Sequence, residues 1–191
     1  MPRRIVIGID PGADGAVAAV DVVGRLVLGV ALCRTWAPVV DGEGEAARMT
    51  ADLGWPLVAP AMLRRLGVLS GDVVDLVVEA PQLRPGQSGG ATQGWRAGAL
   101  AASVVGELAV ITGLPVARVE VVTASAWTRS LGLHGDRADR SARKRARVAR
   151  VLDLAPDARP MLVGPGCRVE HDGAADAILI ALYGAGLGRL S

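Results

Sequence analysis

Apolar residues along the first 32 positions follow the pattern of β-strands. Residues 3–10 form an apolar run that Asp10-Pro11-Gly12 ends, which predicts a buried strand. Two valine-rich runs that meet at Val23-Gly24 predict an antiparallel three-stranded meander with that first strand. Later apolar runs, followed by Pro81 and Thr123, predict two more strands. The five predicted strands cover residues 3–10, 15–22, 25–32, 73–79 and 116–122.

Apolar residues at helical spacing occupy the segments between and after those strands. Pro56 suits the first turn of one helix, and Thr123 suits the N-cap of a short one. The polar, glycine-rich segment 82–94 predicts a loop. The longer predicted helices cover residues 56–66, 95–112, 140–152 and 172–183. This order of elements predicts one α/β domain over residues 1–191, built on a mixed sheet.

Composition excludes several classes of protein. With 51% hydrophobic residues among 191, the chain can bury enough apolar surface to exclude an intrinsically disordered protein. Its two cysteines, Cys33 and Cys167, form no CxxC pair, which excludes a disulfide scaffold and favours a reducing compartment. No apolar run reaches the roughly 18 residues that a membrane span needs, so we expect no membrane association.

Basic residues are concentrated in one segment. The net charge of the chain is only +2, yet residues 136–150 contain seven arginines and lysines and two aspartates. A helix with this charge either presents a solvated face or binds the phosphates of a nucleic acid.

Carboxylates stand at positions where packing alone does not explain them. Asp10 ends the first predicted strand and Glu79 ends the fourth, and Asp172 and Asp176 open an otherwise apolar helix. Buried carboxylates without a partner are costly, so several at strand and helix ends suggest a shared cation. Hard divalent ions such as Mg²⁺ and Mn²⁺ prefer oxygen ligands, and a spacing of four residues places both aspartates on one helix face. His171 is a further candidate ligand.

Each of these residues also has a purely structural interpretation. Asp10 can bond its own backbone in a turn, Glu79 can be a surface charge at a strand end, and Asp172 can cap the last helix. His171 can equally contact a metal ligand without touching the ion, or be an exposed loop residue. The four carboxylates therefore indicate a bound cation only when they are taken together.

Five segments together resemble the RuvC-like Holliday-junction resolvases, especially the phage-type branch of this RNase H-like superfamily. They occur in the order of the family and span nearly the whole chain. They are IGIDPGADGAVA (7–18), VVEAPQ (77–82), ASAWTRSLGL (124–133), SARKRARVARVL (141–152) and HDGAADAILIALYG (171–184).

The resemblance implies an RNase H-like α/β fold: a five-stranded mixed sheet, with an antiparallel three-stranded meander and two parallel strands, flanked by helices. It implies a homodimeric endonuclease that resolves four-way DNA junctions by paired symmetric nicks, in the cytoplasm of a bacterium or of the host of a phage. Two Mg²⁺ ions per site, which Mn²⁺ can replace, would hydrolyse the phosphodiester and leave 5′-phosphate and 3′-hydroxyl ends.

The resemblance also assigns catalytic and metal-binding roles. Asp10 matches the aspartate of the first strand, Glu79 the glutamate of the fourth, and Asp176 the aspartate of the last helix. Many members carry an acid where this chain has Gly173. Asp172 or His171 must then supply the fourth ligand, and the phage-type pattern favours Asp172.

DNA contacts are expected from the basic helix and from the loop after Glu79. Trp95 at the end of that loop either stacks on an unpaired base or caps the core. Thr128 stands where the phage-type motif commonly has lysine, and the neighbouring Arg129 can supply that charge. The expected DNA-binding residues are Arg84, Gln87, Trp95, Arg96, Arg129, Arg140, Arg143, Lys144 and Arg147.

Other functions remain open for the same motifs. The nearest alternative is another RNase H-like nuclease, acting on other branched DNA or on precursor ribosomal RNA. The segment 7–18 also looks like the phosphate-binding hairpin of actin-like and sugar-kinase ATPases. Those proteins use two such domains around a nucleotide, and this chain supplies one. A DNA-binding module without activity is disfavoured because all four carboxylates are present.

Overall fold

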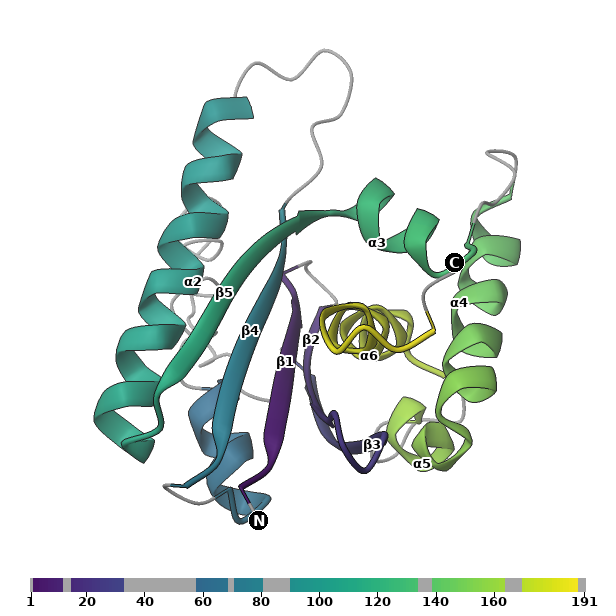
Figure 1. The fold of residues 1–191 in the computed structure, drawn as a ribbon. Helices are drawn as coiled ribbons and strands as arrows, with labels where there is room; N and C mark the ends of the chain where they lie inside the picture. Colours follow the sequence, from purple (N-terminus) through teal and green to yellow (C-terminus); the bar gives the residue numbers. More distant parts are fainter. Residues whose placement is uncertain are drawn as a thin grey trace, which may run out of the picture.

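A computed structural model describes residues 2–11, 15–32, 58–68, 71–80, 90–133, 139–163 and 170–188, without the side chains of residues 90–97. Its centre is a five-stranded sheet in the order β3-β2-β1-β4-β5 (Figure 1). The strands are β1 (Arg4–Asp10), β2 (Ala16–Asp21), β3 (Leu26–Leu32), β4 (Val73–Ala80) and β5 (Val116–Thr123).

The directions of the strands define the fold class. β1 and β2 pair antiparallel, as do β2 and β3, which forms the predicted meander. β4 runs parallel to β1 on its other side, and β5 runs parallel to β4. This mixed sheet has the arrangement of an RNase H-like fold and confirms the predicted fold class.

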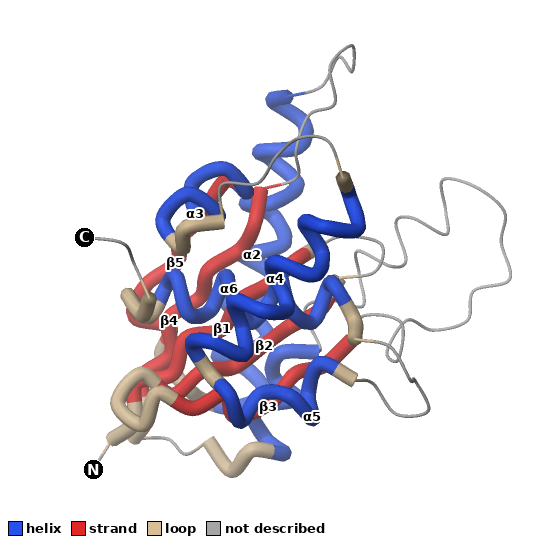
Figure 2. The backbone as a smooth tube through the Cα atoms, turned by 90° about the vertical axis from the view of Figure 1, so that its right-hand side faces the viewer, coloured by secondary structure: helices blue, strands red, loops and turns tan. Residues whose placement is uncertain are grey.

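Helices cover both faces of the sheet (Figures 1 and 2). α2 (Gly90–Thr112) and a helix over residues 58–65 lie on one face. α6 (Asp172–Gly184) lies on the other face, and α4 (Arg140–Leu154) packs on its outer side. Two short helices complete this layer: α3 (Ala124–Ser130) and α5 (Arg159–Leu162). A 3₁₀ turn over Pro156–Ala158 comes directly before α5.

The sheet has a hydrophobic core on each face, and successive side chains of β1 point alternately into one and the other. Ile5, Ile7 and Ile9 point to the α2 face, whereas Val6 belongs to the core under α6. Gly8 lies under α6 at a close approach: a Cβ built there would be 2.3 Å from the carbonyl oxygen of Ala177. The glycine therefore lets α6 lie directly on the strand.

Most predicted elements lie within two residues of their observed bounds. Thr123 is the N-cap of α3, as predicted, and its Oγ1 accepts from the Ala126 amide. α2 is the exception, because it begins at Gly90 whereas the prediction was 95. Ala91, Thr92 and Gln93 are compatible with a helix, so the glycines on either side did not mark its start. The short helical turns over 156–162 were not predicted. None of the helices in the described ranges is both long and apolar enough to span a membrane.

Candidate active site

Asp10 and Glu79 lie side by side at one edge of the sheet. Ile9 pairs with Val78 in the parallel ladder of β1 and β4, so the next residues of the two strands are Asp10 and Glu79. Both alternate with residues of the α2 face and therefore point to the α6 face. The carboxyl ends of two neighbouring parallel strands thus place two acids under the same helix.

α6 brings two more carboxylates to this edge. Asp172 and Asp176 lie in its first two turns, and the adjacent Ala177 packs against Gly8, two residues before Asp10. The side chain of Asp176 is 13% exposed and that of Asp172 is 33% exposed. The N-terminal part of α6, whose later residues are almost all buried, therefore faces the acids of the sheet.

The carboxylates act on one another electrostatically. Burial and the charge of Asp10 raise the pKa of Glu79 from its usual 4.5 to about 7, against the opposing effects of Trp127 and Arg147. Burial also raises the pKa of Asp176 from 3.8 to about 8, and the charges of Asp10, Glu79 and Asp172 add to the rise, while Arg147 opposes it. Such shifts in neighbouring acids are typical of functional sites.

Two basic residues of α4 pair with the acids of α6. Lys144 Nζ lies 2.5 Å from Asp172 Oδ2, and Arg147 Nη1 donates to Asp176 Oδ2. Burial acts to raise the pKa of Asp172, but the hydrogen bond and the charge of Lys144 outweigh it and hold the pKa below its usual value. The sequence predicts DNA contacts for both of these bases. In the structure they neutralise the candidate site, and a role in DNA binding stays a prediction.

Trp127 joins the site from α3. Its side chain is fully buried, and its Nε1 donates a hydrogen bond of 2.8 Å to Glu79 Oε2. The Arg147 guanidinium carbon lies 5.3 Å from the centre of the indole ring, a cation–π distance. No local sequence pattern predicts this hydrogen bond, because Glu79 lies 48 residues away in the chain.

Two polar atoms of the site have no partner in the part of the chain that is described. Asp176 Oδ1 and His171 Nδ1 are both buried and make no hydrogen bond there. A carboxylate oxygen and an imidazole nitrogen are both metal ligands, so the residues fit a divalent cation. No three His, Cys, Asp or Glu side chains of the described ranges converge closely enough to hold an ion. Three of the acids are turned toward Lys144, Arg147 and Trp127 instead.

The other predicted DNA-binding residues are placed as follows. Arg140 and Arg143 are exposed on α4, and Arg129 is exposed on α3. Arg84 and Gln87 lie outside the described residues. Trp95 and Arg96 lie in α2, and their side chains are not described.

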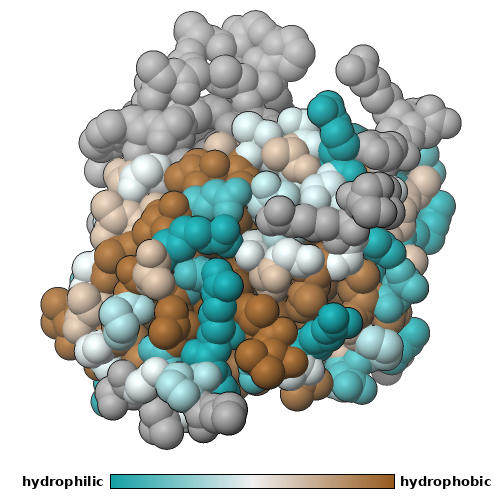
Figure 3. Space-filling model, viewed as in Figure 1, coloured by the Kyte–Doolittle hydropathy of each residue, from teal (hydrophilic) through white to brown (hydrophobic). Residues whose placement is uncertain are grey.

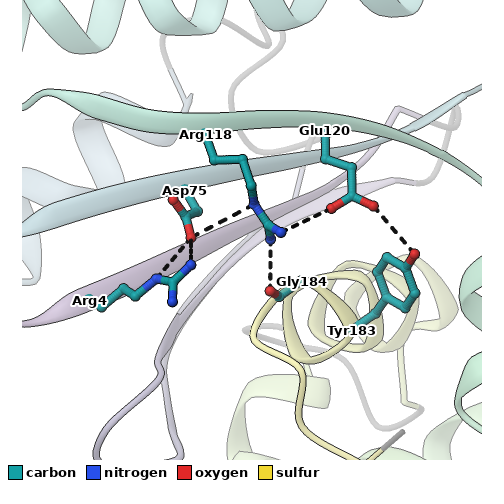
Figure 4. Close-up of polar contacts among 6 residues, drawn as sticks. All are labelled: Arg4, Asp75, Arg118, Glu120, Tyr183 and Gly184. Carbon is teal, nitrogen blue, oxygen red and sulfur yellow. Dashed lines mark hydrogen bonds and ion pairs between the residues drawn. The ribbon is translucent and has the colours of Figure 1, made fainter.

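A second polar cluster lies nearer the start of β4 (Figure 4). Its Asp75 stands four residues before Glu79 in the strand and therefore points to the same face of the sheet. The buried carboxylate of Asp75 accepts from Arg4 at 2.6 and 3.0 Å and lies 3.9 Å from Arg118 Nε. Arg118 also donates to the carbonyl of Gly184 at the end of α6. In the orientation of Figure 1, hydrophilic side chains form a band across the surface of the molecule (Figure 3). Asp75 is not among the functional residues that the sequence predicts. Its arginine partners make it a structural clamp between sheet and helix.

Comparisons with known proteins add one similarity. No protein-family model matches the chain, and no curated protein sequence matches it. Among solved structures, the chain is similar to Thermus thermophilus RuvC, with 17% sequence identity, a TM-score of 0.47, and coverage of 97% of this chain and 99% of that one.

Proposed function

We propose that the chain, residues 1–191 as one domain, is a metal-dependent endonuclease that cuts four-way DNA junctions. The grouping of acids from three separate segments carries this proposal. Asp10 and Glu79 end neighbouring strands on the face that α6 covers, and their charges, added to burial, raise the pKa of Asp176 on that helix. The five motifs that resemble junction resolvases contain all of these acids.

The acids would hold two Mg²⁺ ions, which Mn²⁺ can replace. Asp10 ends the central strand of the sheet and would be the shared ligand, and Glu79, Asp176 and either Asp172 or His171 would supply the others. Bound ions of this kind supply an activated water and stabilise the leaving oxygen, with 5′-phosphate and 3′-hydroxyl products. The buried face under α6 keeps these carboxylates away from bulk water, so an ion gains more from them than from surface acids.

DNA would approach across α4. Arg140 and Arg143 are exposed on this helix, which also carries Lys144 and Arg147 over the acids. Cations spaced along one helix can follow a phosphate backbone, so the binding should weaken as salt rises. Arg129 and the segment containing Arg84, Gln87, Trp95 and Arg96 would contact the junction further out.

A homodimer fits the substrate. A four-way junction has two-fold symmetry, and two nicks at symmetric positions need two sites with the same symmetry. We therefore propose that two copies of the chain bind one junction, in the cytoplasm of a bacterium or of the host of a phage.

The test compares substrates and metals in one cleavage assay. Labelled four-way junction, replication fork, linear duplex and structured RNA are each incubated with Mg²⁺, Mn²⁺ or chelator. We expect paired symmetric nicks in the junction alone, only with metal, and none with Asp10→Asn. Asp157→Asn, an exposed aspartate in the turn before α5, is the matched control and should cut normally.

Each other outcome has a definite meaning. Cutting of forks or of RNA at equal rates would replace the junction with the broader nuclease alternatives. Cutting by Asp10→Asn at the wild-type rate, or undiminished cutting in chelator, would refute the assignment of the site.

A further inference from the structure

Trp127 has a polar contact that core packing does not require. Its ring is fully buried between α3 and the rest of the α6-side core, and its only ring donor points to Glu79 Oε2 at 2.8 Å. We infer that Trp127 is a positioning residue, whose indole N–H fixes the Glu79 carboxylate so that its other oxygen can bind a divalent ion. This inference rests on the proposed function, because it assumes that Glu79 binds metal.

The environment of Trp127 holds its N–H in a defined place. α3 begins directly at the end of β5, where Thr123 caps it, and Val122 of β5 pairs with Glu79 in the ladder. Inside the helix, Thr128 Oγ1 donates to the Ala124 carbonyl at 2.6 Å. The carboxylate lies on β4 and the donor lies on the helix that directly follows β5, so the pairing of these two strands leaves little freedom in the distance between them.

Arg147 extends the same contact to the second acid. It covers the Trp127 ring at 5.3 Å and donates to Asp176, so the ring lies between Glu79 and the arginine that pairs with Asp176. Four elements, β4, α3, α4 and α6, thus meet around one indole. A change in the orientation of the indole would therefore disturb the contacts of both Glu79 and Asp176.

A glutamate at a strand end would otherwise be free to rotate about three side-chain torsions. A hydrogen bond to one carboxylate oxygen removes most of this freedom before an ion binds. The side chain therefore loses less conformational entropy when the ion binds. Groups that hydrogen-bond a metal ligand typically contribute about tenfold or more to metal affinity.

The test measures Mn²⁺ affinity by calorimetry, with no DNA present and with the full chain. Trp127→Phe keeps a buried ring but removes the donor, and we expect it to weaken Mn²⁺ binding by about tenfold. Leu131→Val, at the buried C-terminal end of α3, is the matched control for lost packing and should bind Mn²⁺ within twofold of wild type. Glu79→Gln and the double variant Trp127→Phe/Glu79→Gln complete a mutant cycle.

The cycle separates positioning from a general loss of structure. If Trp127 acts through Glu79, Trp127→Phe changes the affinity of the Glu79→Gln protein by less than twofold. An equal loss in both backgrounds, or no loss in either, would overturn the inference while leaving a metal-binding wild type and its proposed function intact. A wild type that binds no Mn²⁺ would refute the proposed function itself, and this inference with it.

An NMR measurement on the wild type covers the case in which Trp127→Phe does not fold. The indole ¹⁵N–H signal of Trp127 is assigned by replacing the other three tryptophans, Trp36, Trp55 and Trp95, with phenylalanine in turn. Because the N–H bonds a ligating carboxylate, this signal should shift on saturation with Mg²⁺ in the wild type and not in Glu79→Gln. An unchanged signal in wild type that binds Mg²⁺ would overturn the inference.

Discussion

Glu79→Gln should stabilise the metal-free protein, and increasingly so as the pH rises. The substitution removes the charge but keeps an oxygen that can accept from Trp127 Nε1. Burial and the charge of Asp10 raise the pKa of Glu79 from 4.5 to about 7 in the folded chain. At about 1.4 kcal/mol per pKa unit, ionising Glu79 costs the folded state about 3 kcal/mol at most.

The sign follows from the direction of the pKa shift. A folded-state pKa above the unfolded value means that the folded protein holds the proton more tightly. Its contribution to stability is complete below pH 4.5 and is lost as the pH rises through about 7. The free energy of unfolding of Glu79→Gln, relative to wild type, should therefore increase by about 2 to 3 kcal/mol between pH 5 and pH 8.5.

Urea unfolding followed by circular dichroism, with a chelator throughout, measures this difference. Glu107→Gln on α2, on the opposite face of the sheet, is the matched control for the same substitution outside the site. A difference between Glu79→Gln and wild type that stays constant from pH 5 to pH 8.5, or that shrinks, would show that burial and Asp10 do not raise the pKa of Glu79.

Three further predictions concern the site and the sheet. Because the pKa of Asp176 is raised to about 8, mainly by burial, Mn²⁺ affinity measured by calorimetry should increase from pH 6 to pH 8.5, and a flat profile would contradict this. Gly8→Ala should lower the free energy of unfolding by about 3 kcal/mol or more, because its Cβ would overlap the α6 backbone at Ala177. Gly98→Ala on α2, where a Cβ meets open space, should instead stabilise by up to about 1 kcal/mol, and equal effects of the two in urea unfolding would refute the close approach. Asp75→Ala removes the two hydrogen bonds from Arg4 and the nearby charge beside Arg118, which keeps Glu120 as a partner. It should destabilise by about 2 kcal/mol in the same assay, whereas a loss below about 0.5 kcal/mol would show that Asp75 contributes little to stability.

The sheet could be predicted from the sequence because its signals are local. A continuous apolar run ended by Asp10-Pro11 describes β1 wherever that strand lies in the molecule. The same holds for Thr123, whose capping bond spans only three residues. The start of α2 was mispredicted since glycine at positions 90 and 94 is typical of loops and is tolerated here in a helix.

Contacts between distant segments could not be predicted in this way. Trp127 and Glu79, or Arg4 and Asp75, are joined by the order of the strands, which sequence patterns leave open. Asp75 stands in the middle of an apolar strand, which signals a buried acid that needs a cation, but nothing in the sequence says which arginine supplies it.

The basic helix shows why charge counting overestimates a DNA-binding surface. A net positive segment predicts phosphate contacts only if its charges face outward. In α4, Lys144 and Arg147 are one turn apart and meet Asp172 and Asp176, which are one turn apart on α6. These two cations balance acids that would otherwise repel one another, and the exposed Arg140 and Arg143 remain for a phosphate backbone. The charge of this helix thus includes two cations that balance the candidate active site, and only the remaining cations are available for the proposed DNA contact. The sequence cannot separate the two groups, because it does not show that α6 lies beneath α4.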